Sequence, residues 1–182
     1  MKSVLISIRP KWCEKIANGE KTIEVRKTRP KQETPFKCYI YCTKPKHDYE
    51  DYIVVFDKPD SFFAGGKVIG EFVCDSILQH CEMGNIDIAE QCSCVSRKNI
   101  RAYSQGKEVY GWHISDLKIY DQLKELSEFY TKCDERCENC SLWQSVRVNY
   151  EEFDMECSSS VYGCKPLSRP PQSWCYVEDG AT

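Results

Sequence analysis

The sequence contains no apolar run near the length that a membrane-spanning helix needs. The apolar residues 4–8 follow a single charge at Lys2 and are interrupted by Arg9, so they are too short for the hydrophobic core of a signal peptide. The aromatic and aliphatic content is ordinary for a folded protein. We therefore expect a folded cytoplasmic protein that has no membrane partner.

A strong net charge is also missing, since 25 Lys and Arg oppose 28 Asp and Glu. This balance hides an asymmetry, because residues 1–50 hold 12 Lys and Arg against 6 Asp and Glu, and the remainder carries about nine net negative charges. A basic region favours a phosphate-bearing partner, whereas the acidic remainder weakens nonspecific attraction to nucleic acid. The alternative is a solvated face that binds nothing.

Cysteine, in contrast, is abundant, with 13 in the chain. In a reducing compartment such thiols serve as metal ligands or small apolar core residues rather than as a disulfide framework. We expect Cys38 and Cys42 to be core residues on one face of a strand, with Tyr39 and Tyr41 on the other.

The sequence is organised around residues 9–26, which combine a helix, a turn and a strand. Pro10 suits the first turn of a helix because its missing N–H has no intrahelical partner there. Trp12 and Ile16 are four residues apart and therefore share one helix face. Gly19 supplies the left-handed conformation that ends such a helix.

Residues 22–26 then alternate with the two-residue period of a β-strand. We expect Ile23 and Val25 to face the core, so that Glu24 and Arg26 share the opposite face with Lys21 at its mouth. A carboxylate and a guanidinium on one strand face predict a polar cleft that is open to solvent.

These residues carry a resemblance to a known family. The pattern G-x-K-x-x-E-x-R at Gly19, Lys21, Glu24 and Arg26 is similar to the signature of the ASCH domain, a branch of the PUA-like β-barrel superfamily. Further stretches that resemble this family, in the same order, are residues 66–72, 111–120 and 169–178. The similarity covers about residues 1–130 and 169–179.

The resemblance implies an α+β fold, a PUA-like small mixed β-barrel flanked by short helices. We expect a single domain over residues 1–182, with a cysteine-rich insert over 132–168 and a last strand over 170–178. Local patterns predict further strands at residues 37–42, 52–56, 67–74 and 112–119, and helices at 97–105 and 123–130.

The insert has few aliphatic residues and cannot build much core of its own. Its candidate metal ligands are Cys133, Cys137, Cys140, Cys157 and Cys164. Tetrahedral zinc needs four deprotonated ligands. The closely spaced Cys133, Cys137 and Cys140 supply three thiols, and Cys157 or Cys164 supplies the fourth. The spacing predicts a structural zinc site, with an iron–sulfur cluster or unligated thiols as the alternatives.

The resemblance implies a ligand for the cleft, because PUA-like domains commonly recognise RNA or a modified base. Cations attract phosphate and aromatic rings stack on unpaired bases, so we expect RNA or a nucleotide or nucleoside ligand. Trp12 and Trp112 are candidate stacking platforms, and core packing explains either of them equally well. The candidate ligand-binding residues are Arg9, Lys11, Trp12, Lys21, Glu24, Arg26 and Trp112.

Enzymatic alternatives follow from the same resemblance. Small ASCH proteins act as amidohydrolases on N4-acetylcytidine with the signature lysine, a threonine three residues later and a distant glutamate. Lys21 matches this pattern, but Glu24 occupies the threonine position, and a Lys–Glu–Arg cluster keeps lysine charged and makes it a poor base. The candidate catalytic residues are Lys21, Glu24 and Glu71, and Glu71 has the alternative role of pairing with Arg26.

Two further alternatives are a ribonuclease and a protein-interaction module. The sequence has only three His, which are far apart and offer no histidine pair, so nothing in it specifies the acid–base pair of a ribonuclease. An interaction module would use the cysteine-rich insert and the acidic second half of the chain.

Overall fold

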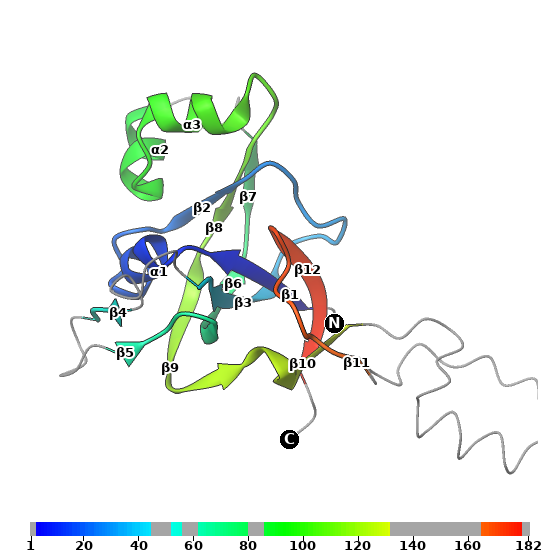
Figure 1. Ribbon diagram of the computed structural model, residues 1–182. Helices are drawn as coiled ribbons and strands as arrows, with labels where there is room; N and C mark the ends of the chain where they lie inside the picture. The colour runs from blue at the N-terminus through cyan, green and yellow to red at the C-terminus, as the bar shows by residue number, and fades with distance from the viewer. Residues whose placement is uncertain (1–2, 45–51, 56–61, 80–85, 132–164, 180–182) are drawn as a thin grey trace, which may run out of the picture.

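The computed structural model describes residues 3–44, 52–55, 62–79, 86–131 and 165–179 (Figure 1). The helices are α1 (Pro10–Ala17), α2 (Ile86–Ser93) and α3 (Arg97–Ser104), with a 3₁₀ turn, η2, at Leu126–Glu128. The strands are β1 (Ser3–Ile8), β2 (Ile23–Arg26), β3 (Phe36–Cys42), β4 (Tyr52–Ile53), β5 (Phe62–Phe63), β6 (Lys67–Cys74), β7 (Ile77–Gln79), β8 (Tyr110–His113), β9 (Ser115–Glu125), β10 (Phe129–Thr131), β11 (Lys165–Pro166) and β12 (Trp174–Asp179).

Seven of these strands form one mixed sheet in the order β11-β10-β12-β1-β3-β6-β9. The pairing of β1 with β3 is parallel, and the other neighbours are antiparallel. Its two faces bury different clusters because successive strand residues point to opposite sides. Cys38 and Cys42 belong to the main core, whereas Tyr39 and Tyr41 pack in a smaller cluster on the other face, as predicted.

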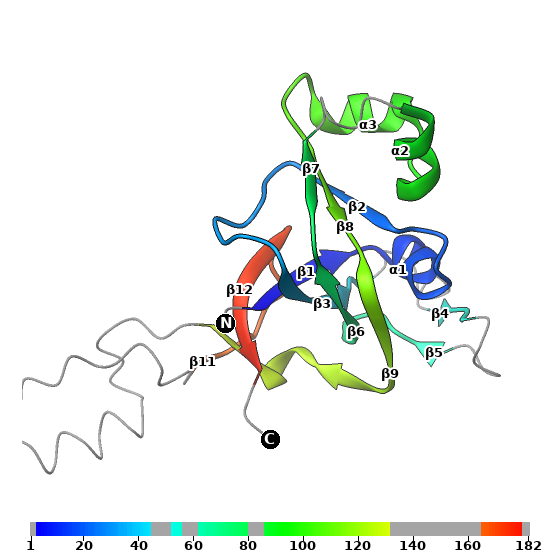
Figure 2. The same cartoon turned by 180° about the vertical axis from the view of Figure 1, so that it is seen from behind.

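A second sheet of three strands, in the order β2-β8-β7, places its inner face over the main core. Trp112 of β8 is fully buried there, with its ring 5.8 Å from that of Phe36. The outer face carries Val25 of β2, which packs against Ile100 of α3. In both Figure 1 and Figure 2, α2 and α3 lie beside β2, β7 and β8, at the end of the molecule away from β10 and β11.

The mixed α+β class and the short helices agree with the prediction, but the closed barrel does not. Within the described residues the seven-stranded sheet is open, with β11 and β9 at its edges, and the three-stranded sheet is separate from it. The remaining strands, β4 and β5, pair only with each other among the described residues. The predicted insert over 132–168 lies largely outside the described residues.

Most predicted elements occur within a few residues of their expected bounds, and one is wrong. The helix expected at residues 123–130 is instead the end of β9, the turn η2 and the start of β10. The expected last strand begins later than predicted, at Trp174. None of the helices in the described part of the chain is long and apolar enough to span a bilayer.

Candidate functional site

The signature residues lie at the junction of the two sheets, where β2 passes the end of β1. Gly19 has a φ of +73°, the left-handed conformation that ends α1 and turns the chain into β2. Glu24 lies opposite Trp112 in the register of β2 and β8, and Arg26 lies opposite Tyr110. The prediction that Glu24 and Arg26 share one strand face is therefore confirmed.

Lys21 is enclosed by acceptors. Its Nζ donates to the carbonyl oxygens of Ile23 at 2.8 Å and Ser93 at 2.6 Å, and it lies 3.2 Å from Oε2 of Glu24. The ring of Trp12 lies 5.3 Å from the same ammonium, within the range of a cation–π contact. The ammonium thus has two hydrogen bonds and one ion pair.

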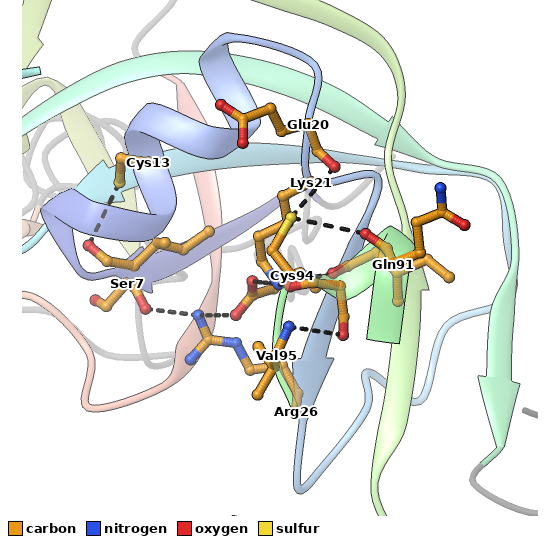
Figure 3. A network of polar contacts seen from close by, with 12 residues as sticks. Ser7, Cys13, Glu20, Lys21, Arg26, Gln91, Cys94 and Val95 are labelled. Carbon is orange, nitrogen blue, oxygen red and sulfur yellow. Dashed lines mark hydrogen bonds and ion pairs between the residues drawn. The ribbon is translucent and has the colours of Figure 1, made fainter. Parts of the chain in front are cut away.

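Arg26 completes the cluster from the other side of Glu24. One of its terminal nitrogens, Nη2, donates to the carbonyl oxygen of Ser7 at 2.6 Å and lies 3.1 Å from Oε1 of Glu24 (Figure 3). The carboxylate of Glu24 therefore lies between two cations, one at each oxygen. We call Lys21, Glu24 and Arg26 the charged cluster.

The charged cluster is buried, so the expected solvent-facing cleft is wrong. Lys21, Glu24 and Arg26 are only 2%, 7% and 8% exposed. This burial results from the tertiary structure, because the face of β2 that carries the three side chains is turned toward the main core and not away from it. The end of α2 covers Lys21 as well, since the backbone N–H of Thr22 donates to the carbonyl of Cys92 at 2.8 Å.

Three buried side-chain atoms on this face have no hydrogen-bond partner within the described part of the chain. They are Oε2 of Glu24, Nε of Arg26 and Nε1 of Trp112. Oε2 is close enough to Lys21 for an ion pair but does not meet the geometry of a hydrogen bond. Buried polar atoms are nearly always paired, so these three lack a protein hydrogen bond that such atoms usually make.

Trp112 is not an open stacking platform. Its side chain is fully buried, and its ring lies 5.9 Å from that of Trp174 and 5.8 Å from that of Phe36. Only the edge of this ring, through Nε1, is available for a polar contact. The prediction of a face-stacking role for Trp112 is therefore wrong, and its alternative as a core residue is confirmed.

The other expected binding residues lie on α1 or just before it. The ring of half-buried Trp12 has the ammonium of exposed Lys11 at 4.9 Å, in addition to that of Lys21. Arg9 is exposed and is the N-cap residue of α1, where its carbonyl accepts from the backbone N–H of Trp12. The structure therefore brings Lys11, Trp12 and Lys21 together and leaves the Arg9 side chain at the surface.

Glu71 does not belong to the charged cluster. Its Oε2 accepts from the hydroxyl of Tyr120 at 2.6 Å, and its Oε1 lies 3.5 Å from Nζ of Lys37. Glu71 lies opposite Tyr39 in the β3–β6 register, and Tyr39 packs in the smaller cluster on the far face of the large sheet. The predicted pairing with Arg26 is wrong, and Glu71 is too remote to act in catalysis with Lys21.

The five cysteines predicted to bind zinc lie outside the described residues: Cys133, Cys137, Cys140, Cys157 and Cys164. Among the described residues no group of His, Cys, Asp and Glu is arranged to hold a metal ion. The described core thiols are apolar packing residues. Burial raises the pKa of the Cys74 thiol to about 12 and holds that of Cys38 well above its usual value.

Two residues of the site had no signal in the sequence. Ser7 and Ser93 supply the carbonyl oxygens that hold Arg26 and Lys21. Every residue has a backbone carbonyl, so residue type gives no information about this role.

No family model matches the sequence, and no curated protein matches it. The fold is similar to that of ASCH from Zymomonas mobilis, with a TM-score of 0.57 and 18% identity over 97% of this chain and 88% of that chain. A point variant of the same Zymomonas mobilis protein matches with a TM-score of 0.57 and 17% identity, over 98% of this chain and 91% of that chain. This similarity confirms the predicted ASCH resemblance at the level of the fold.

Proposed function

We propose that this chain, which has the ASCH fold, binds an unpaired nucleobase, as a nucleoside, a nucleotide or part of an RNA, at the charged cluster. The fold supports a ligand of this chemical class, because PUA-like domains commonly recognise RNA or a single base. The burial of the cluster favours a small planar group over a duplex, since less than a tenth of each charged side chain is exposed.

The three unpartnered atoms on the inner face of β2 and β8 are the observation that carries this proposal. Nε of Arg26 and Nε1 of Trp112 donate, and Oε2 of Glu24 accepts. A pyrimidine edge presents the complementary groups, carbonyl oxygens beside an N–H or amino group. Leaving a buried polar atom unpaired costs about 1–3 kcal/mol, so a ligand that pairs these atoms recovers that free energy.

Binding is favoured over amide hydrolysis by the surroundings of Lys21. Its ammonium donates hydrogen bonds to the carbonyl oxygens of Ile23 and Ser93 and forms an ion pair with Glu24, so two of its three protons are held in place. A general base needs a free lone pair within reach of a substrate proton. Glu24 also lies between two cations, Lys21 and Arg26, and is the shared counterion of both.

The test is calorimetric titration of the full chain with uridine, cytidine, N4-acetylcytidine and their 5′-monophosphates. We expect saturable one-to-one binding of at least one pyrimidine compound, and weaker binding of adenosine and guanosine when they are titrated in the same way. In parallel, the release of free cytidine from N4-acetylcytidine is followed by chromatography. Absence of binding for every compound contradicts the proposal, and turnover of acetylcytidine favours the amidohydrolase alternative.

The zinc site of the cysteine-rich insert stays a prediction from the sequence. We expect about one zinc per chain in elemental analysis of protein purified without added metal. An absorption band in the visible range indicates the iron–sulfur alternative instead. A protein with neither a metal nor such a band has unligated thiols in this segment.

A further inference from the structure

The loop between β2 and β3 carries a cation at every second residue. Lys27, Arg29 and Lys31 are all exposed, and residues 27–32 include no carboxylate. The loop is anchored at Pro30, which is buried. It is also anchored at Thr28, whose Oγ1 accepts from Nε1 of Trp174 at 3.0 Å. The three charges are therefore presented on a loop that is fixed at two points.

Each of these three residues contacts a tyrosine from a different element, two through the cation and Lys31 through its backbone. Nζ of Lys27 lies 4.9 Å from the ring of Tyr103, and Cζ of Arg29 lies 5.9 Å from the ring of Tyr110. The backbone N–H of Lys31 donates to the hydroxyl of a third tyrosine at 2.9 Å. We call Lys27, Arg29, Lys31 and the three tyrosines, Tyr103, Tyr110 and Tyr176, the loop strip.

The surroundings of the loop strip are also basic. Helix α3, which carries Tyr103, has three exposed cations, Arg97, Lys98 and Arg101, and no carboxylate occurs in residues 95–107. Two carboxylates contact this region: Glu90 accepts from the backbone N–H of Arg97, and Glu108 accepts from the hydroxyl of Tyr110 at 2.9 Å. The positive charge of this region is therefore only partly compensated.

We propose that the loop strip is a docking surface for single-stranded nucleic acid, separate from the charged cluster inside the fold. Surfaces that bind single strands combine a row of cations along the backbone with aromatic rings on which bases stack. The loop strip has three exposed cations, the exposed Tyr103 and the half-buried Tyr110 and Tyr176. Tyr103 is 40% exposed, so part of its ring is free to contact a base.

A single strand fits these observations better than a duplex or an acidic protein. In a duplex the faces of the bases are hidden by stacking, so the aromatic residues would contribute little. An acidic peptide pairs with the cations but offers no planar groups for the tyrosines. RNA and DNA single strands share the chemistry recognised here, so the experiment compares both.

In the test, the full chain is titrated into labelled oligouridylate and oligothymidylate, each about 12 nucleotides long, and into a labelled duplex RNA of equal length. Fluorescence anisotropy of the label measures binding. The triple variant Lys27→Ala, Arg29→Ala, Lys31→Ala removes the cations. A control with the same change in net charge is Lys44→Ala, Lys118→Ala, Arg169→Ala, three exposed cations outside the loop strip. Both variants are checked for an unchanged urea midpoint.

We expect the native chain to bind the single strands more tightly than the duplex. The loop-strip variant should lose at least about tenfold in affinity, and the slope of log K against log salt should fall by about two, as for three lost phosphate contacts. A third variant, Tyr103→Ala, should also lose about tenfold, because it removes one stacking surface. The control triple variant should change affinity by less than about threefold.

Three results overturn the proposal: no binding of either single strand, equal binding of the duplex, or equal losses in the loop-strip and control variants. Equal losses indicate attraction by net charge alone. Nucleoside binding at the charged cluster should be unchanged in the loop-strip variant, because that variant alters no residue of the cluster. Failure of the docking surface is thus distinguishable from failure of the buried site.

Discussion

Arg26 and Lys27 are neighbours in the chain and differ sharply in their surroundings. Arg26 is 8% exposed and is held by Ser7 and Glu24, whereas Lys27 is exposed and contacts the ring of Tyr103 in a cation–π pair. One belongs to the charged cluster and the other to the loop strip. The strand ends between them, so one residue step separates the interior of the fold from its surface.

This difference assigns distinct roles to charges of the same sign. A buried cation must be paired, and removing one partner leaves an uncompensated charge in the interior. An exposed cation contributes little to stability, but it attracts phosphate and responds to salt. The charged cluster should therefore govern folding together with base recognition, and the loop strip should govern salt-dependent attachment of a strand.

The largest expected effect comes from Arg26→Ala. Removal of the guanidinium leaves the buried carboxylate of Glu24 with one cation in place of two. Breaking a buried ion pair typically costs about 3–5 kcal/mol, so the free energy of unfolding in urea should fall by about that amount. The matched control, Lys27→Ala, should change it by less than about 0.5 kcal/mol. Equal effects of the two substitutions would contradict the contrast between the two regions.

This prediction revises an expectation from the sequence. A solvent-facing cleft implied that Lys21→Ala or Arg26→Ala would weaken ligand binding and leave the fold intact. Their burial now predicts a loss of stability as well. Ligand binding at this site is therefore better tested by a substitution that removes no ion pair.

Trp112→Phe is such a substitution, because Nε1 of Trp112 has no partner within the described residues. If this donor bonds to the base, its loss should weaken nucleoside binding about tenfold, the equivalent of one buried hydrogen bond. The control is Trp174→Phe, which breaks the existing hydrogen bond to Thr28. In calorimetric titrations the control should keep the native affinity. The same loss in both variants would mean that packing, and not the donor, supports binding.

A smaller effect is expected for Lys27→Ala on its own. The substitution removes one exposed cation of the loop strip, so the slope of log K against log salt for a single-stranded oligonucleotide should fall by about 0.7. Anisotropy titrations at four salt concentrations measure this slope. An unchanged slope would place Lys27 outside the path of the strand.

The smallest effect is expected at an exposed ion pair, the counterpart of Glu24 and Arg26. Nδ1 of His113 lies 2.7 Å from Oδ1 of Asp75, and both side chains are more than a third exposed. Burial acts to raise the pKa of Asp75, but the hydrogen bond and charge of His113 outweigh it and hold the pKa below its usual 3.8. A lowered pKa in the folded state adds stability above the unfolded pKa, and this contribution is lost as the pH falls through the folded value.

Asp75→Asn should therefore cost at most about 1 kcal/mol at pH 6, as for other exposed pairs, and the difference should be smaller at about pH 2, because the pKa of Asp75 is lowered from 3.8 and the contribution is lost as the pH falls. Urea unfolding at both pH values measures it. A difference of the same size at low pH would show that the substitution acts through packing and not through charge.

The sequence predicted the local structure of the site well. The two-residue period placed Glu24 and Arg26 on one face of a strand, and Gly19 marked the end of α1. Trp174 and Tyr176 are two residues apart in β12 and therefore share a face, and their rings lie 5.5 Å apart. These features depend on neighbours in the chain, so local patterns contain enough information to find them.

Features that depend on distant parts of the chain were missed. The alternation of residue types along a strand shows that two residues share a face, but it does not show whether another part of the chain covers that face. Glu24 was for this reason expected to face solvent, although it is buried. A register shift within β6 likewise changed the side on which Glu71 lies. The spacing of Leu126 and Phe129 fits a helix, yet a capping box at Glu125 and Glu128 closes only a single 3₁₀ turn.

The most direct test of base binding at the charged cluster is a ¹H–¹⁵N spectrum of the indole N–H groups. The chain has four Trp, and Trp→Phe variants assign each signal. When the best-binding pyrimidine nucleoside is added, we predict that the Nε1–H signal of Trp112 moves saturably and farther than those of the other tryptophans. A Trp112 signal that stays in place while the nucleoside binds would contradict the account.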